Sequence, residues 1–324
     1  MKAITFRNYG SPDVLKYEDV PTPSPNDDEV LIKIHAASVN AADWHLLRAE
    51  PFPVRFMLGL TKPKPKFHIL GGDIAGTIEA VGKNVTEFKV GDEIFGDVFN
   101  DGLGAFAEYT CARAKMLVAK PMNLSFVEAA AIPLAAVTAL YGLRDIAKVQ
   151  PGHKVLINGA AGGVGTYAVQ IAKALGAEVT AVSSTRNLEQ SRELGADHVI
   201  DYTKENFTQG DKRYDAILCV NGYYPIRDFK RVLTPNGIYA MPGGGNKLLL
   251  EVMFLGPFHS LGSKKFKLVA SSPNPDRLTD IKNLIEANKL RPVIEKTYPL
   301  AEVPEAIRHV ETGHARGKVV ITMA

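Results

Sequence analysis

The fold is limited most by one segment, KVLINGAAGGVGTYAVQIAKALGAEVTAVSS, at residues 154–184. An apolar run leads into a glycine-rich turn, which is followed by a helical pattern and a second apolar run. This order predicts a strand, turn, helix and strand of a parallel sheet. Small residues let the backbone approach a pyrophosphate, and the N–H groups at the start of a helix attract phosphate. We therefore predict a dinucleotide-binding turn formed by Gly159, Ala160, Ala161, Gly162, Gly163, Val164 and Gly165. Ala160 replaces the first glycine of the usual pattern, and a sheet domain that has lost its ligand is the alternative.

The end of the second strand indicates which dinucleotide is bound. Sites for NAD usually place Asp or Glu there, where the carboxylate binds the ribose 2′-hydroxyl. This strand ends instead in Ser183, Ser184, Thr185 and Arg186. Two serine hydroxyls can donate to a 2′-phosphate and an arginine can pair with it, so the sequence favours NADP. Alternatively, Arg186 is a solvated residue at the start of a helix.

The rest of the chain shows two different patterns of apolar and turn residues. Short strand-like runs separated by turn residues dominate the first third, as in VLIKIHAASV at 30–39 and IAGTIEAVG at 74–82. From about Ser125, strands and helices alternate, which is typical of a parallel sheet with helical crossovers. An amphipathic helix at 276–290 precedes a return to strand character. We predict an α/β protein with a β-rich domain at 1–122 and 272–324 and a doubly wound parallel-sheet domain at 123–271.

Composition excludes several classes of function. The 324 residues include 38 Lys and Arg against 35 Asp and Glu, a net charge of +3, which is too small for a dedicated nucleic-acid binder. Two cysteines, Cys111 and Cys219, cannot build a disulfide framework. The first residues lack the apolar core of a signal peptide, and no window reaches the about 18 apolar residues of a membrane-spanning helix. We expect a cytoplasmic protein with neither a nucleic-acid partner nor a membrane span.

One apolar stretch, at 247–262, does not follow the strand and helix pattern. Its sequence KLLLEVMFLGPFHSLG is compatible with a buried strand and loop. A subunit interface or a lid over an apolar ligand are the alternatives, because apolar surface outside the core often marks an interaction site. A homodimer is therefore one arrangement that the sequence leaves open.

Five motifs in succession, GGDIAGTIEAVG, VGDEIFG, GAAGGVG, LGADHVIDY and GKVVI, carry a resemblance to a known family. With these motifs the chain resembles the medium-chain dehydrogenase/reductase superfamily. It is most similar to the zinc-independent, quinone-oxidoreductase-like branch that includes zeta-crystallin. The resemblance spans essentially the whole chain. It implies a GroES-like β-rich catalytic domain and a Rossmann domain, with the cofactor in the cleft between them.

The resemblance also implies that no catalytic zinc is bound. The zinc-dependent branch supplies a Cys, a His–Glu pair and a third ligand, and these positions correspond here to Asn40, to Gly72 and Asp73, and to Leu134. A zinc site requires at least three ligands such as Cys or His. None of these positions carries a Cys or a His, and two cysteines cannot form the four-cysteine structural zinc lobe. We expect no metal site.

The remaining roles that the resemblance implies fall into two groups. The residues expected around the reacting groups are Asn40, Asp43, Thr138 beside the nicotinamide ring, and His45 as a candidate proton donor. Those expected near the cofactor, besides the turn, are Arg186 and Tyr202 at the 2′-phosphate and Lys318 in the cleft. Structural roles are the alternatives: Asn40 as the cap of a turn, Asp43 as a helix N-cap, and Thr138 in helix packing.

These expectations favour one reaction. Hydride transfer to a carbonyl leaves negative charge on oxygen, and a chain without zinc suits acceptors whose reduced anion is already delocalised. Quinones and α,β-unsaturated carbonyl compounds have this property. The sequence therefore predicts an NADPH-dependent quinone or enone reductase, with Asn40 as a donor to the developing oxyanion. The alternatives are a zinc-free NADP-dependent alcohol or aldehyde dehydrogenase that uses His45, and a non-catalytic dinucleotide-binding protein.

Overall fold

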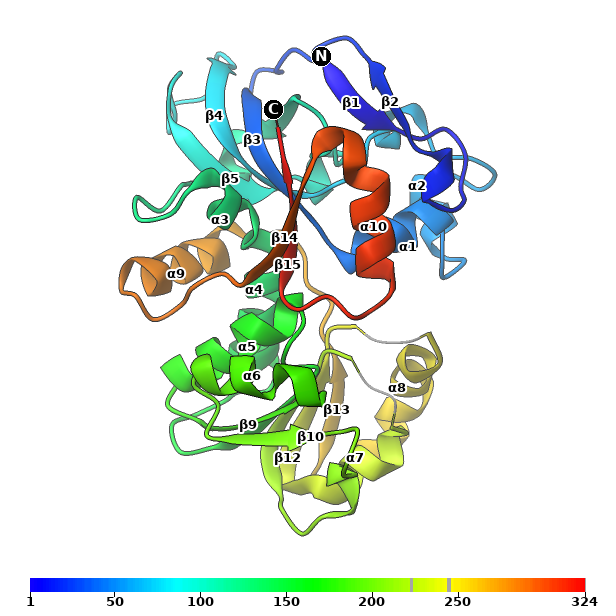
Figure 1. The fold of residues 1–324 in the computed structure, drawn as a ribbon, viewed down its shortest axis with the longest axis vertical. Helices are drawn as coiled ribbons and strands as arrows, with labels where there is room; N and C mark the ends of the chain where they lie inside the picture. Colours follow the sequence, from blue (N-terminus) through cyan, green and yellow to red (C-terminus); the bar gives the residue numbers. More distant parts are fainter. Residues whose placement is uncertain (222–223, 244–245, 324) are drawn as a thin grey trace. The chain divides into compact units, whose positions relative to one another are not determined.

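The computed structural model describes residues 1–221, 224–243 and 246–323 (Figure 1). The chain forms two compact units. The first contains Met1–Leu134, Ser272–Glu286 and the described residues from Pro292 onward, and the second contains Ala135–Ser271 and Ala287–Arg291. The first unit extends past the boundary at residue 122 that the sequence suggested, because the helix that follows packs on its sheet.

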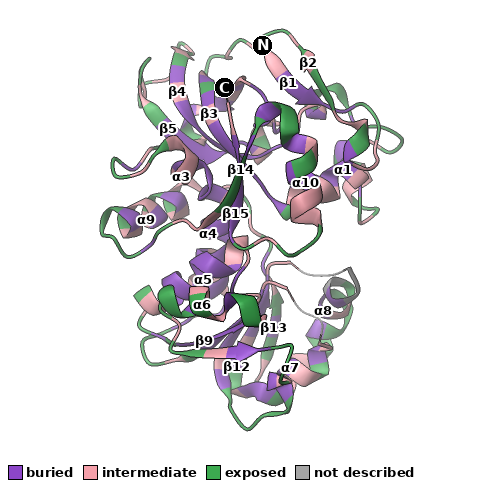
Figure 2. Ribbon diagram, viewed as in Figure 1, coloured by how far each residue is buried: buried purple, intermediate pink, exposed green. Residues whose placement is uncertain are grey.

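The first unit is built around a mixed sheet whose strand order within the described residues is β14-β15-β3-β4-β5-β7, with β6 also paired to β3. Alternating apolar residues of β3, Val30, Ile32 and Ile34, belong to its hydrophobic core. Figure 2 colours the ribbon by burial, and much of β3 and β4 is buried. The sheet strands are β3 (Glu29–Val39), β4 (Asp73–Val81), β5 (Glu93–Asp97), β6 (Tyr109–Arg113), β7 (Leu117–Ala119), β14 (Ile294–Pro299) and β15 (Lys318–Thr322), with β1 (Lys2–Thr5) and β2 (Lys16–Asp19) forming a separate hairpin. The helices are α1 (Ala41–Arg48), α2 (Val54–Leu58), α3 (Phe126–Ala130), α9 (Pro275–Glu286) and α10 (Val303–Glu311).

The second unit is a doubly wound sheet with the strand order β10-β9-β8-β11-β12-β13, and every pairing in it is parallel. Its strands are β8 (Lys154–Asn158), β9 (Glu178–Ser183), β10 (His198–Asp201), β11 (Tyr214–Cys219), β12 (Leu233–Met241) and β13 (Lys265–Leu268). Its helices are α5 (Gly163–Ala174), α6 (Leu188–Glu193), α7 (Ile226–Val232) and α8 (Asn246–His259), and α4 (Pro133–Leu140) leads into the unit through a π-helix at Tyr141–Ile146. In chain order the strands read 3-2-1-4-5-6, the order of a Rossmann fold. The predicted fold class is confirmed.

One sequence interpretation was wrong. The stretch at 247–262 is not a buried strand and loop, because its described part contains the helix α8. Leu248 and Val252 of α8 are buried, whereas Phe254 and Phe258 are exposed, so only one side packs on the sheet. The subunit-interface and lid interpretations stay predictions. The return to strand character after the helix at 276–290 is confirmed by β14 and β15, and the amphipathic helix α10 lies between them.

Among the described residues, no helix is both long and apolar enough to cross a lipid bilayer.

Candidate active site

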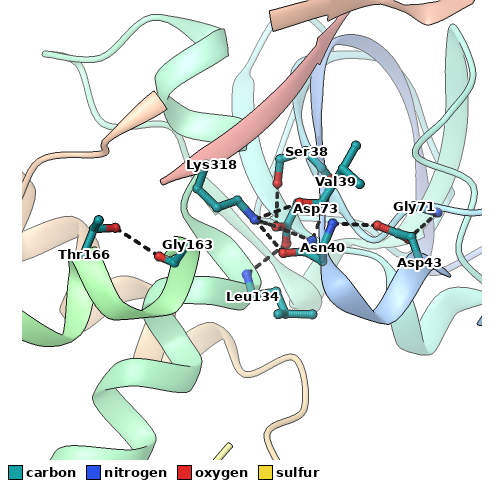
Figure 3. A network of polar contacts seen from close by, with 10 residues as sticks. All are labelled: Ser38, Val39, Asn40, Asp43, Gly71, Asp73, Leu134, Gly163, Thr166 and Lys318. Atoms are coloured by element: carbon teal, nitrogen blue, oxygen red, sulfur yellow. Dashed lines mark hydrogen bonds and ion pairs between the residues drawn. The ribbon is translucent and has the colours of Figure 1, made fainter. Parts of the chain in front are cut away.

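A buried polar network lies at one end of the first unit's sheet, centred on the carboxylate of Asp73 (Figure 3). Oδ2 of Asp73 accepts hydrogen bonds from Ser38 Oγ at 2.8 Å and from Asn40 Nδ2 at 2.9 Å, and Lys318 Nζ lies 3.4 Å away. Oδ1 accepts from the Leu134 backbone N–H at 2.8 Å. Both carboxylate oxygens are therefore satisfied, as a buried charge requires.

Strand pairing brings these residues together from distant parts of the sequence. β3 pairs with β4 so that Ser38 lies opposite Asp73, and β15 pairs with β3 so that Val319 lies opposite Val39. Asn40 follows the last residue of β3, and Lys318 is the first residue of β15. The ends of three strands therefore meet at one point, which places a carboxylate, an amide and an ammonium group within hydrogen-bonding distance.

The side-chain amide of Asn40 is held between two charges of opposite sign. Its Oδ1 accepts from Lys318 Nζ at 2.5 Å, and its Nδ2 donates to Asp73. A flipped amide would point N–H groups at the ammonium and its oxygen at the carboxylate, so the network fixes one orientation. The second Nδ2 hydrogen faces the Ser38 carbonyl at 3.5 Å, which is a long hydrogen bond. This second N–H of the Asn40 amide therefore makes only a weak hydrogen bond.

Asp43 is buried at the third position of α1, for which Asn40 is the N-cap residue. Its carboxylate accepts from the Asn40 backbone N–H at 2.7 Å and from the Gly71 N–H at 3.2 Å. Asp43 is thus not the N-cap itself, which was the structural alternative for this residue. Burial raises its pKa to about 7, and the nearby Asp73 charge acts in the same direction, against the effect of the two N–H donors.

Asp97 is a third buried carboxyl group that the sequence analysis missed. It lies opposite Asp73 in the β4–β5 pairing, and its Oδ1 accepts from the Phe99 N–H at 2.9 Å. Burial and repulsion by the Asp73 charge raise its pKa to about 8. A Cβ added to Gly72 would lie 2.7 Å from Asp97 Oδ1, so the position equivalent to a zinc-binding histidine has no room for a side chain while Asp97 keeps its place.

A sequence signal for Asp73 existed, since a lone carboxylate at the start of the apolar run IAGTI must be paired if that strand is buried. For Asp97 the sequence gives no such signal, because its proximity to Asp73 follows from strand register alone.

Lys318 and His45 make contacts within the first unit, and their expected roles stay predictions. The Lys318 side chain is buried and its Nζ contacts Asn40, Asp73 and the Val39 carbonyl at 3.5 Å, all within the first unit. His45 stacks on Trp44, and its Nδ1 lies 2.9 Å from the Glu50 carbonyl oxygen. Burial lowers the pKa of His45 below its ordinary value, so the ring is neutral at physiological pH. No hydrogen bond described for His45 connects it to the Asp73 network.

The glycine turn of the second unit has the geometry of a dinucleotide site. Gly162 is the N-cap of α5, so the N–H groups of the next three residues precede the first intrahelical hydrogen bond. A Cβ added to Gly165 would lie 2.1 Å from the Gly159 carbonyl oxygen, so the helix can pack on the turn only when residue 165 is glycine. Around Gly162, by contrast, the nearest atom to an added Cβ is 3.7 Å away, which leaves space beside the helix start. Ala160 and Ala161 are buried, and Gly163 and Val164 begin the helix.

Unsatisfied polar atoms lie beside this turn. Ser183 Oγ and Asn187 Oδ1 are buried and make no hydrogen bond to the part of the chain that the structure describes. Buried polar atoms without a hydrogen-bond partner are uncommon unless a ligand or a water molecule supplies one. Ser184 accepts from Asn187 Nδ2 at 3.2 Å, Arg186 is exposed, and the Tyr202 N–H donates to the Ser183 carbonyl at 3.2 Å. The four residues expected at a 2′-phosphate therefore gather at the ends of β9 and β10, and Asn187, which was not predicted, joins them.

A carboxylate lies closer to this group than the sequence suggested. Asp201 lies opposite Ser183 in the parallel β9–β10 pairing. Its oxygens accept from Thr185 Oγ1 at 2.5 Å and from Thr203 Oγ1 at 2.6 Å, and these hydrogen bonds lower its pKa to about 2. Asp201 is therefore ionised, and threonine hydroxyls cover its charge. The hydroxyl group of Thr185 therefore donates its hydrogen to Asp201.

Thr138 is buried on α4 and belongs to the second unit, with the glycine turn. Asn40, Asp43, His45 and Lys318 belong to the first unit. Each unit thus contributes its own set of candidate residues.

Two family descriptions match parts of the chain: an alcohol dehydrogenase GroES-like domain at residues 26–122 and a zinc-binding dehydrogenase domain at residues 194–321. Over 99% of its length the chain is 37% identical to 2-methylene-furan-3-one reductase of Solanum lycopersicum, of which it covers 79%. The chain belongs to the quinone-oxidoreductase-like branch of the medium-chain dehydrogenase/reductase superfamily.

Other members of the superfamily match over similar lengths. The chain is 34% identical to the chloroplastic NADPH-dependent alkenal/one oxidoreductase of Arabidopsis thaliana, with 99% of this chain and 79% of that protein covered. Its structure is similar to that of the quinone oxidoreductase from Coxiella burnetii, with a TM-score of 0.89, 31% identity, and coverage of 100% of this chain and 99% of the other. The resemblance found in the sequence motifs is confirmed.

Proposed function

We propose that this protein is an NADPH-dependent oxidoreductase that reduces quinones or α,β-unsaturated carbonyl compounds. The observation that carries the proposal is a dinucleotide turn with unsatisfied polar atoms beside it. The chain also matches proteins named as reductases of these two classes over almost its whole length. When bound, NADPH supplies the hydride. The chain's own residues would bind it, orient the acceptor and stabilise the charge that develops on oxygen.

The residues of the second unit fit NADPH. The N–H groups at the start of α5 would hold the pyrophosphate. Ser183, Ser184, Arg186 and Tyr202 would hold the 2′-phosphate, and the unpaired Ser183 hydroxyl is suited to donate to it. Thr138 would pack beside the nicotinamide.

In the first unit, Asn40 is the residue that we propose to touch the acceptor. Its second Nδ2 hydrogen is held only by the long contact to the Ser38 carbonyl, so an acceptor oxygen could replace that contact. Asp73 and Lys318 fix the amide in place before the acceptor arrives, which avoids reorganisation during the reaction. Asp43 supports the start of α1, directly after Asn40.

We further propose that the reaction needs no zinc. Asn40 and Leu134 cannot replace Cys or His as ligands, and the packing of Asp97 excludes a side chain at Gly72. Within the described residues, no three His, Cys, Asp or Glu side chains are grouped as metal ligands. A delocalised quinol or enolate anion needs less stabilisation than an alkoxide, which is consistent with a single amide donor.

The compartment and assembly remain predictions. The Arabidopsis relative is named as chloroplastic, so the expected cytoplasmic location is a hypothesis to be tested by fractionation. A small-molecule acceptor is the expected ligand, and a homodimer can be tested by sedimentation.

The deciding experiment measures NADPH oxidation against a panel of quinones, enones, saturated aldehydes and saturated ketones. We expect quinones and enones to react much faster than saturated carbonyl compounds. Asn40→Ala should lower kcat/KM by about ten- to a thousandfold and leave the Kd for NADPH nearly unchanged. Asn84→Ala is the matched control, because Asn84 bonds to Asp28 at the exposed surface of the same unit. A saturated aldehyde that reacts fastest, with His45→Ala more damaging than Asn40→Ala, would favour the alcohol dehydrogenase alternative, and NADPH binding without any turnover would favour the non-catalytic one.

A further inference from the structure

We propose that the segment from Phe52 to Lys66, which contains α2, is a docking surface for anionic lipid bilayers. The proposal concerns where the protein works, and it does not depend on the identity of the acceptor. It rests on the charge of the segment, the exposure of its apolar side chains, and the contacts that hold them in place.

The segment concentrates positive charge. Between Glu50 and Asp73 the chain has four basic residues and no Asp or Glu. The whole chain has 38 basic and 35 acidic residues, so everything outside this interval holds 34 basic and 35 acidic residues and is close to neutral. The entire positive excess therefore comes from Arg55, Lys62, Lys64 and Lys66. The three lysines alternate with prolines in the sequence KPKPK and are exposed, while Pro63 and Phe67 are buried.

The same segment exposes large apolar side chains. Phe52 is 63% exposed, Phe56 68% and Leu60 59%, although residues of these types are usually covered in a folded protein. The rings of Phe52 and Phe56 contact each other edge to face with centroids 5.8 Å apart, so they form one apolar surface. Leu58, between them and the lysines, is fully buried and attaches the segment to the core.

Hydrogen bonds hold the segment in a defined shape. Tyr9 donates its hydroxyl hydrogen to the Gly59 carbonyl at 2.6 Å, and the Lys64 N–H donates to the Leu58 carbonyl at 2.8 Å. Arg55 lies over the Tyr9 ring at 4.9 Å and donates to the Leu60 carbonyl at 3.2 Å. The aromatic rings are thus presented outward by a supported turn.

A lipid surface with negative charge matches both features. Membrane-surface proteins bind by inserting apolar side chains at the headgroup boundary while basic residues attract anionic lipids, and the two signals together give stable binding. A second copy of this chain would bring the same positive segment against itself in a twofold contact, which charge repulsion disfavours. Four charges are also few for nucleic acid.

The test is co-sedimentation of the full-length protein with vesicles of phosphatidylcholine alone and of phosphatidylcholine mixed with phosphatidylglycerol. We expect binding only to the anionic vesicles, and weaker binding as salt is raised. Changing the three lysines to Gln should weaken binding by about a hundredfold, since each contributes roughly 1 kcal/mol at such a surface. The matched control changes three exposed lysines elsewhere in the first unit: Lys16, Lys89 and Lys115.

A second pair of variants separates the apolar contribution from the charge. Phe52→Ser with Phe56→Ser should also weaken vesicle binding, whereas Val90→Ser with Met122→Ser, at exposed positions outside the segment, should not. Circular dichroism checks folding, and the lysine variant keeps the test decisive if the serine variant does not fold.

Three results would overturn the proposal. The first is no binding of the unchanged protein to anionic vesicles at low salt. The second is unchanged vesicle binding in the lysine variant. If the serine variant then only raises KM for a water-soluble acceptor, Phe52 and Phe56 belong to the acceptor site. The third is a dimer in solution that either variant converts to a monomer.

Discussion

Replacing Asp97 with Asn removes one buried ionisable group while keeping the local hydrogen bond. The Asp97 carboxyl group accepts from the Phe99 N–H through Oδ1, and an asparagine amide oxygen can accept the same bond. The substitution removes the ionisable group from a buried site beside Asp73. Asparagine also has the shape of a protonated aspartate, so packing around Gly72 is preserved.

The size and sign of the effect follow from the pKa of Asp97. Burial and the Asp73 charge raise this pKa from 3.8 to about 8 in the folded protein. Below 3.8 the carboxyl group is protonated whether the chain is folded or unfolded, so it adds no pH dependence there. As pH rises from there to about 8, the unfolded chain releases this proton before the folded one, so stability falls with pH. At about 1.4 kcal/mol for each pKa unit, the loss approaches an upper limit of about 6 kcal/mol at alkaline pH.

Thermal unfolding of Asp97→Asn and the unchanged protein across pH measures this difference. The two Tm values should be close at acidic pH, and the variant should become more stable as pH rises, by on the order of 10 °C at alkaline pH. Asp211→Asn, at an exposed position, is the control for the loss of a carboxyl group that is not buried. A Tm difference for Asp97→Asn that stays constant with pH, or that favours the unchanged protein at alkaline pH, would refute the reasoning.

Three further predictions concern the two candidate sites. Arg186→Ala should raise the Kd for NADPH about tenfold to a hundredfold in a fluorescence titration, because one hydrogen bond to a charged group is lost. The Kd for NADH should stay the same. Unchanged Kd values for both dinucleotides would move the phosphate contact to Tyr202. Lys318→Met should lower the free energy of unfolding by about 3–5 kcal/mol because Asp73 loses its buried counter-charge, with little change in NADPH binding; a normal Tm combined with weakened NADPH binding would instead assign the ammonium group to the cofactor. Elemental analysis of the purified protein should find no stoichiometric zinc and chelators should leave its activity intact, so one zinc per chain with chelator-sensitive activity would contradict the proposed reaction.

Local sequence was sufficient for the core of the second unit. The apolar run at Lys154–Asn158, the glycine turn and the helix at Gly163–Ala174 are consecutive, and each depends mainly on the periodicity and small residues of its own segment. The order of the motifs also sufficed to recognise the family. The interpretation of 247–262 as a strand and loop failed because an apolar run has no periodicity that separates a strand from a helix. In the structure this run forms α8, which packs on β13.

The polar network of the first unit depended on tertiary structure. Asn40 and Lys318 are 278 positions apart in the sequence, and they meet because β15 pairs with β3 in one register. The same pairing brings Lys318 to the Asp73 network, and its expected place in the cofactor cleft stays a prediction. Asp201 likewise reaches Ser183 only through the pairing of β9 and β10. The types of side chain are written in the sequence, but their pKa values and hydrogen-bond partners depend on burial and on neighbours that only the folded sheet brings together.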